Sequence, residues 1–159
     1  MTPNDTLLEA ARSGDIGALR AALAQGANRV VLNAAKSIAI EHGHGLAVEY
    51  LLEHGAELQQ NDLFLISLLG DEEAACEVAR AVLRAGGDIN RSFDGHPRTA
   101  LHAAVVADKP VLAKFLLENG ADIRPGTEHA AELMRLTSPK SELRAILLDA
   151  MESEAAGSP

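Results

Sequence analysis

Apolar residues recur along the chain with helical spacing, and one short ending closes four of these helical stretches. Residues 23–28 read LAQGAN, and related endings follow at 52–57 (LEHGAE), 83–88 (LRAGGD) and 117–122 (LENGAD). They share a glycine, at intervals of roughly 30 residues, at positions Gly26, Gly55, Gly86 and Gly120. Glycine suits the left-handed residue that ends a helix, because it has no Cβ to clash there. The pattern therefore predicts four copies of one unit, each ending in a helix.

A second helix is predicted ahead of the one that each glycine closes. Two apolar stretches with helical spacing precede each glycine, and a turn divides them, at Gly14-Asp15, Gly43-His44, Gly70-Asp71 and Asp108-Lys109. Each unit thus reads as helix, turn, helix. In the third unit the turn at Gly70-Asp71 lies four residues further from its glycine than in the other units, so four extra residues fall within 71–77 (DEEAACE). These residues should lengthen the second helix, or the turn before it, by about one helical turn.

The fourth unit, residues 94–124, resembles an ankyrin repeat. Thr99-Ala100-Leu101-His102 stands where that family has Thr-Pro-Leu-His, and residues 120–123 (GADI) match its Gly-Ala-Asp-Val ending. The resemblance implies that Thr99 caps the first helix and that His102 ties neighbouring loops together. In the second unit the tetrapeptide position falls at 34–37 (AAKS), so the first helix is expected to begin there. Lys36 occupies the place of a buried Leu, which leaves that helix start open.

The resemblance implies an all-α fold, an ankyrin-repeat solenoid of stacked helix-turn-helix units with mostly short loops and one long finger. We expect a single domain over 1–159, with units at about 6–29, 30–58, 59–90 and 91–124, a C-terminal cap at 125–151 and a frayed polar tail at 152–159. The cap reads as a helix from Glu128 to Leu136, followed by a helix for which Ser138 is the N-cap and Pro139 the first residue.

Composition narrows the possible partners. Aromatic residues make up 3% of the chain, so small and straight-chain side chains must build the core, which favours close-packed helices. Acidic residues outnumber basic ones by 23 to 14, and the net charge of -9 would repel nucleic acid. No stretch approaches the roughly 20 apolar residues of a membrane span. We expect a cytoplasmic protein, monomeric when free, whose partner is a basic protein rather than nucleic acid or membrane.

Catalytic, cofactor and metal motifs are not found in the sequence. Three of the six histidines, His42, His44 and His54, fall in the second unit, but a metal site needs three or four converging ligands. His44 occupies the turn-histidine position of the family, and a histidine is favoured at a helix C-terminus such as that of His54. The single cysteine, Cys76, has acidic neighbours that disfavour a nucleophilic thiolate. We therefore expect no enzyme activity, no cofactor and no metal; the enzyme alternative would need His42, His44 or Cys76.

The resemblance places partner binding on the loops between units and on the exposed side of the first helices. Only the third loop, residues 87–98 (GDINRSFDGHPR), has the length of a full finger. The two residues before each first-helix turn should line the concave face, at Arg12/Ser13, Glu41/His42, Leu68/Leu69 and Val106/Ala107. The predicted partner-binding residues are Phe93, His96, Arg98, Leu68, Leu69, Val106, Glu41 and His42.

Two alternatives stay open for these residues. The lengthened third unit could cover Leu68 and Leu69, and Phe93 could pack the base of its own loop. The leading function is a non-catalytic module that binds a protein through its concave face and the 87–98 finger. A sharper alternative is an immunity or inhibitor protein that neutralises a basic bacterial toxin or effector, since an acidic stack suits such a target.

Overall fold

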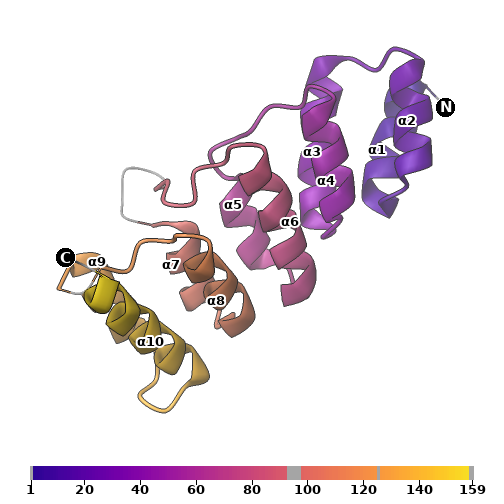
Figure 1. The fold of residues 1–159 in the computed structure, drawn as a ribbon. Coiled ribbons are helices and arrows are strands. Elements are labelled where there is room, and N and C mark those ends of the chain that lie inside the picture. The colour runs from indigo at the N-terminus through magenta and orange to yellow at the C-terminus, as the bar shows by residue number, and fades with distance from the viewer. Residues whose placement is uncertain (1, 93–97, 125, 158–159) are drawn as a thin grey trace. The chain divides into compact units, whose positions relative to one another are not determined.

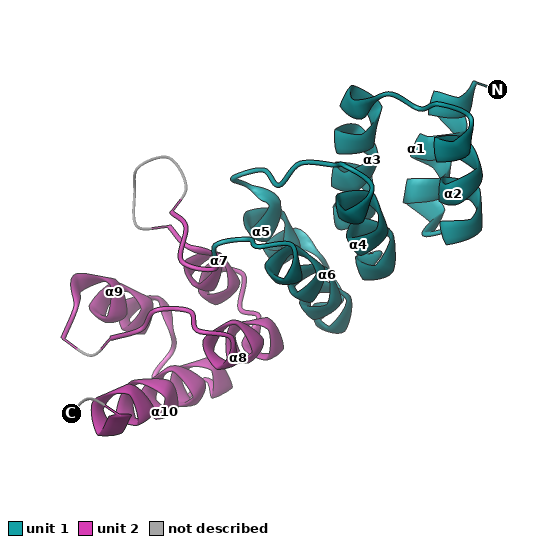
Figure 2. Ribbon diagram, turned by 45° about the horizontal axis from the view of Figure 1, so that its top comes forward, with its two compact units in different colours: residues 1–88 teal, residues 89–159 magenta. Residues whose placement is uncertain are grey.

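The computed structural model describes residues 2–92, 98–124 and 126–157, which form ten α-helices and one short 3₁₀ helix (Figure 1). The chain divides into two compact units, residues 1–88 and 89–159 (Figure 2). Within each unit the helices pack in neighbouring pairs. The predicted all-α fold of helix-turn-helix pairs is therefore confirmed.

Unit 1 holds three stacked helix pairs. Its helices, in chain order, are α1 (Pro3–Ser13), α2 (Ile16–Ala24), α3 (Arg29–Glu41), α4 (Gly45–Glu53), α5 (Asp62–Leu65), the 3₁₀ helix η1 (Ile66–Leu68) and α6 (Glu72–Arg84). Helix α1 packs on α2, α3 on α4, and the short α5 and η1 on α6. The pairs stack through contacts of α1 with α3 and of α4 with α6.

Local capping explains where these helices begin and end. Asp15, Asn28 and Asp71 each accept a backbone hydrogen bond from the first turn of the helix that follows, which satisfies donors with no partner inside that helix. The marker glycines adopt positive φ angles, from 90° at Gly26 to 103° at Gly55, as the sequence predicts. Their backbone conformation, rather than crowding, requires glycine, since an added Cβ at either one would meet nothing within 4 Å.

The second unit's first helix begins at Arg29, which corrects the start expected from the family tetrapeptide at 34–37. The side chain of Asn28 caps this helix by accepting from the amide of Val31 at 3.0 Å. Only residues 27 and 28 separate Gly26 from α3, so the loop is shorter than a helix start at the tetrapeptide position 34–37 would make it. A good N-cap residue close to the preceding glycine decided the start, and the tetrapeptide lies inside the helix.

The third unit's extra residues lengthen its second helix, one of the two predicted outcomes. Helix α6 has 13 residues, whereas α2, α4 and α8 have nine each. The first helix of the same unit is short, because α5 passes into the 3₁₀ turn of η1 and the chain becomes extended at Leu69. This unit is therefore asymmetric, with a long second helix beside a brief first one.

Unit 2 holds one helix pair and the predicted C-terminal helices. Its elements are α7 (Ala100–Val106), α8 (Pro110–Glu118), α9 (Glu128–Leu136) and α10 (Glu142–Gly157). Helix α7 packs on α8, α9 covers α7, and α10 covers α8, with Leu133, Leu143 and Leu147 buried. Helix α9 has the predicted bounds. None of the helices in the described ranges is long and apolar enough to cross a membrane.

The last helix differs from the prediction at both ends. It begins at Glu142 rather than at Pro139, because the Ser141 hydroxyl accepts from the amide of Arg144 at 3.2 Å. The Arg144 guanidinium also donates to the Met134 carbonyl at 2.7 Å and holds the preceding turn out of the helix. The helix continues to Gly157, so residues 152–157 are exposed but helical, and the expectation of a frayed tail is wrong there.

Candidate functional site

A buried ion pair joins the second and third repeats of unit 1. The Lys36 ammonium lies 2.5 Å from Asp62 Oδ2 and donates to the Glu57 carbonyl at 2.6 Å, and both side chains of the pair are essentially fully buried. The same Asp62 oxygen accepts from the Gln59 amide at 2.8 Å. The Asn33 side chain accepts from the Glu57 amide at 2.7 Å. Helix α3 therefore fixes the loop that leads into α5.

His44 couples the first and second repeats. Its Nε2 lies 2.9 Å from the Arg12 carbonyl, the end of α1. Its ring fills the space beside Gly14, where an added Cβ would lie 2.8 Å from Nδ1. Gly14 also has a φ of 72°, so both conformation and space require glycine. The ends of α1 and α3 are thereby held next to each other.

Together these contacts position a row of exposed side chains on unit 1. The row comprises the residues at the ends of α1, α3 and η1, namely Arg12, Ser13, Glu41, His42 and Leu68. Leu68 is 68% exposed. We call these five residues the unit 1 row. It contains one large apolar side chain, and its other four side chains are charged or polar.

Leu69 does not belong to this surface, which corrects its prediction as a partner-binding residue. It is 9% exposed, and both its methyl groups lie 3.9 Å from the position that a Cβ on Gly43 would take. The extended backbone at Leu69, with φ -66° and ψ 135°, turns consecutive side chains to opposite sides. Leu69 is therefore buried beside Gly43 of the second repeat, while Leu68 stays exposed.

In unit 2, the predicted residues Phe93 and His96 lie outside the described residues. Arg98 is exposed, and Val106 at the end of α7 is 61% exposed. The start of the 87–98 loop is anchored by Asn90, whose side chain donates to the Gly120 carbonyl at 3.1 Å and accepts from the Asp122 amide at 2.7 Å. Asn90 was not predicted from the repeat pattern, because that pattern consists of glycines and apolar residues only.

Thr99 caps α7, as the resemblance implies, by accepting from the His102 amide at 3.3 Å. His102 reaches a helix rather than a loop, since its Nε2 lies 3.6 Å from Glu132 Oε1 on α9. The pKa of His129 is lowered, mainly by burial and secondly by the nearby His102, while Asp122 and Glu132 oppose this shift. Both His129 ring nitrogens are buried without a hydrogen-bond partner.

The histidines of the second repeat do not form a metal site. His42 and His54 each place Nδ1 on a carbonyl of their own helix, at 2.9 Å from Ile38 and 2.7 Å from Tyr50. Within the described residues, no group of three or more His, Cys, Asp and Glu side chains could hold a metal ion. Cys76 is buried. His42 and His54 thus each have a hydrogen-bond partner within their own helix.

Comparison with known proteins agrees with the helix pairs. The family model for the ankyrin repeat matches residues 98–126, which include α7 and α8. Two plant proteins, each called potassium channel AKT1, from the indica and japonica subspecies of Oryza sativa, are 40% identical over 67 residues. The match covers 42% of this chain and 7% of the channel, so the chain is similar to a small part of those proteins.

Proposed function

Because this chain is an ankyrin repeat protein, we propose that it binds another protein through the unit 1 row and the 87–98 loop, without catalysis. Ankyrin repeats are in general protein-interaction modules, and the fold by itself names no partner. The unit 1 row supports the proposal because its side chains are exposed while the backbone beneath them is fixed by the Lys36–Asp62 pair and the His44 contact.

One observation carries this proposal, the 68% exposure of Leu68, a large apolar side chain in a row whose other members are charged or polar. Protein interfaces typically have an apolar centre and a polar rim, and a few central side chains supply most of the binding energy. Leu68 would be that centre, and Arg12, Glu41 and His42 would form the rim. In unit 2 we propose that Phe93, His96, Arg98 and Val106 contribute a second contact surface.

The partner's chemistry follows from charge. A chain with a net charge of -9 attracts a basic surface at long range and accelerates its association. We therefore propose a basic protein partner and, as the sharper alternative, an immunity or inhibitor role toward a basic bacterial toxin or effector. A cytoplasmic location belongs to the same proposal.

The experiment first identifies the partner by affinity capture from the native host and then measures its affinity for two matched variants. Leu68→Glu changes the proposed centre, while Leu46→Glu changes a leucine of similar exposure, 71%, on α4 of the same unit. We expect Leu68→Glu to weaken binding at least ~30-fold, about 2 kcal/mol, and Leu46→Glu by less than about twofold. The opposite order would place the interface on the second helices and overturn the proposal.

A further inference from the structure

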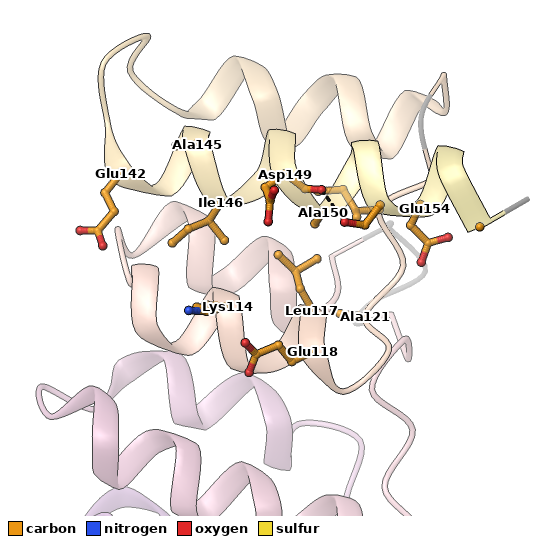
Figure 3. Close-up of a pocket in the computed structure, with 13 residues that line it drawn as sticks. Lys114, Leu117, Glu118, Ala121, Glu142, Ala145, Ile146, Asp149, Ala150 and Glu154 are labelled. Carbon is orange, nitrogen blue, oxygen red and sulfur yellow. Dashed lines mark hydrogen bonds between the residues drawn. The ribbon is translucent and has the colours of Figure 1, made fainter.

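Unit 2 carries an open groove between α8 and α10 that has no part in the proposed function above. Its volume is about 670 Å³, and Figure 3 shows side chains from both helices along it. Helix α8 and the segment after it contribute Lys114, Leu117, Glu118, Ala121 and Ile123. Because Leu117 and Glu118 follow Lys114 by three and four positions, these three residues lie on one face of α8, and Ala121 belongs to the turn that follows it.

Helix α10 lines the groove along its entire length. Its lining residues are spaced by three and four positions, at Glu142, Ala145, Ile146, Asp149, Ala150, Ser153, Glu154 and Gly157. This spacing is one complete face of a helix. Leu143 and Leu147, on a different face, are buried and hold α10 against α8. The fold therefore needs only part of α10 and leaves a second face open.

The centre of the groove is apolar. In Figure 3 Leu117 and Ile146 point from the two helices into the space between them, and the small side chains of Ala145 and Ala150 leave room beside them. Leu117 and Ile146 are only half-buried. An occupant with aliphatic side chains would complete their burial, which is favourable by about 25 cal/mol per Å² of apolar surface.

The rim of the groove is acidic. Four exposed carboxylates, those of Glu118, Glu142, Asp149 and Glu154, line it against a single amine, that of Lys114. A basic occupant complements this rim, whereas a second copy of the chain, with a net charge of -9, would be repelled. The acidic rim therefore favours a basic occupant, whereas the apolar centre would accept any aliphatic one.

The length of the groove selects a helix. From Glu142 to Gly157 the lining face of α10 extends for roughly 22 Å at 1.5 Å per residue, which matches about four helical turns. Two neighbouring helices with an open seam commonly receive a third helix, whose apolar stripe fills the seam. We propose that this groove binds an amphipathic, basic helix of a partner protein, with Leu-type side chains on Leu117 and Ile146 and Lys or Arg beside the rim carboxylates.

The test uses three synthetic peptides of about 18 residues, roughly five helical turns. The first has a leucine stripe flanked by lysines, the second replaces each lysine with glutamate, and the third replaces each leucine with serine. Binding to the full chain is followed by fluorescence anisotropy and by the methyl NMR signals of Leu117 and Ile146. We expect only the first peptide to bind and to shift both methyl signals.

Matched variants separate the groove from general attraction to an acidic protein. Glu118→Lys with Asp149→Lys reverses two rim charges, and Glu53→Lys with Glu152→Lys makes the same charge change at exposed sites outside the lining. Ile146→Gln alters the floor, and Leu148→Gln alters a leucine, 43% exposed, that does not line the groove. We expect the rim and floor variants to weaken binding at least ~10-fold and their controls less than about twofold.

Three results would overturn the proposal. The first is no binding of the leucine–lysine peptide up to about 1 mM. The second is equal weakening by the rim pair and its control pair, which would mean attraction to net charge alone. The third is self-association of the free chain in sedimentation that Ile146→Gln abolishes, which would identify a second copy as the occupant. None of them depends on whether Leu68 contributes to partner binding, so the two proposals fail separately.

Discussion

At the scale of single residues, the Lys36–Asp62 pair shows how unit 1 replaces an expected apolar contact by a charged one. Lys36 stands at a buried helix position, yet its ammonium is satisfied by Asp62 and by the Glu57 carbonyl. Desolvating two charges is costly, and the attraction between them only offsets that cost when their geometry and hydrogen bonds are good. The pair therefore fixes the position of the loop more than it adds stability.

We predict that Lys36→Met lowers the free energy of unfolding by about 3–5 kcal/mol, because it leaves the Asp62 carboxylate buried without its partner. Lys36→Met combined with Asp62→Leu should recover most of that loss, since no charge then stays buried. Urea denaturation of the wild type, the two single variants and the double variant measures the coupling. Equal midpoints for wild type and Lys36→Met would rule out this role.

Lys36 is recognisable as unusual from the sequence, but its partner Asp62 is not. Lys36 stood out because the repeat pattern expects leucine there, while Asp62 lies 26 residues later, in the next repeat. A helical pattern relates positions three or four residues apart and carries no information on pairing across repeats. The same reason explains why the Asn33 and Asn90 contacts were not predicted.

His129 should make the stability of unit 2 depend on pH. Its pKa is lowered from the ordinary value, mainly by burial, so the unfolded chain binds the proton more tightly than the folded one. Stability is therefore present above the ordinary pKa of 6.5 and is lost as the pH falls below it. We predict that lowering the pH from about 7.5 to about 5.5 lowers the thermal midpoint of unfolding, and that His129→Gln makes this decrease smaller.

At the scale of elements, glycines and alanines set the distance between helices α4 and α6. A Cβ on Gly45 would lie 2.9 Å from the backbone carbonyl carbon of Glu77, and a Cβ on Gly43 would lie 2.9 Å from Ala74 Cβ. The two helices therefore approach with almost no side chain between them. Close approach of this kind fits a chain with 3% aromatic residues.

We predict that Gly45→Ala destabilises unit 1 by about 1–3 kcal/mol, although alanine is the better helix former by about 1 kcal/mol. The backbone of α6 cannot yield as a flexible side chain can, so crowding decides the sign. Gly70→Ala is the matched control, because an added Cβ there meets nothing within 4 Å and its φ is not positive. Thermal unfolding that finds Gly45→Ala as stable as Gly70→Ala would exclude the close approach.

Element positions were predictable where one local signal dominated. The bounds of helix α9 follow from caps and spacing alone, while the spacing placed the extra residues of the third unit in α6 or in the turn before it. The starts of α3 and α10 were not, because the sequence pointed to a different start for each, the family tetrapeptide position at 34–37 for α3 and Ser138-Pro139 for α10. Asn28 and Ser141 define the actual starts through single hydrogen bonds, which composition and periodicity do not reveal.

At the scale of the whole molecule, excess negative charge should act on association rather than on the fold. The electrostatic screening length shrinks from about 30 Å at 0.01 M salt to about 8 Å at 0.15 M. We predict that the association rate with a basic partner falls at least ~10-fold over this range, while the dissociation rate changes little. Stopped-flow measurements give both rates. An association rate independent of salt would remove the basic partner from the proposal.

The candidate surface was predictable only in part. The exposure of Glu41, His42, Leu68 and Val106 agrees with their assignment to the ends of first helices. The burial of Leu69 could not be read from the sequence, because adjacent leucines look alike until the backbone becomes extended between them. The groove beside α10 was also missed, since the sequence treated that helix as a cap with one apolar face.

The most direct test of the central claim is hydrogen exchange of the chain with and without its captured protein partner. If the unit 1 row is the interface, the amides of residues 12–15, 41–44 and 66–70 become protected in the complex, while α2 and α4 keep the exchange rates of the free chain. Protection confined to α2 and α4, with unchanged exchange at the row, would contradict the proposed function.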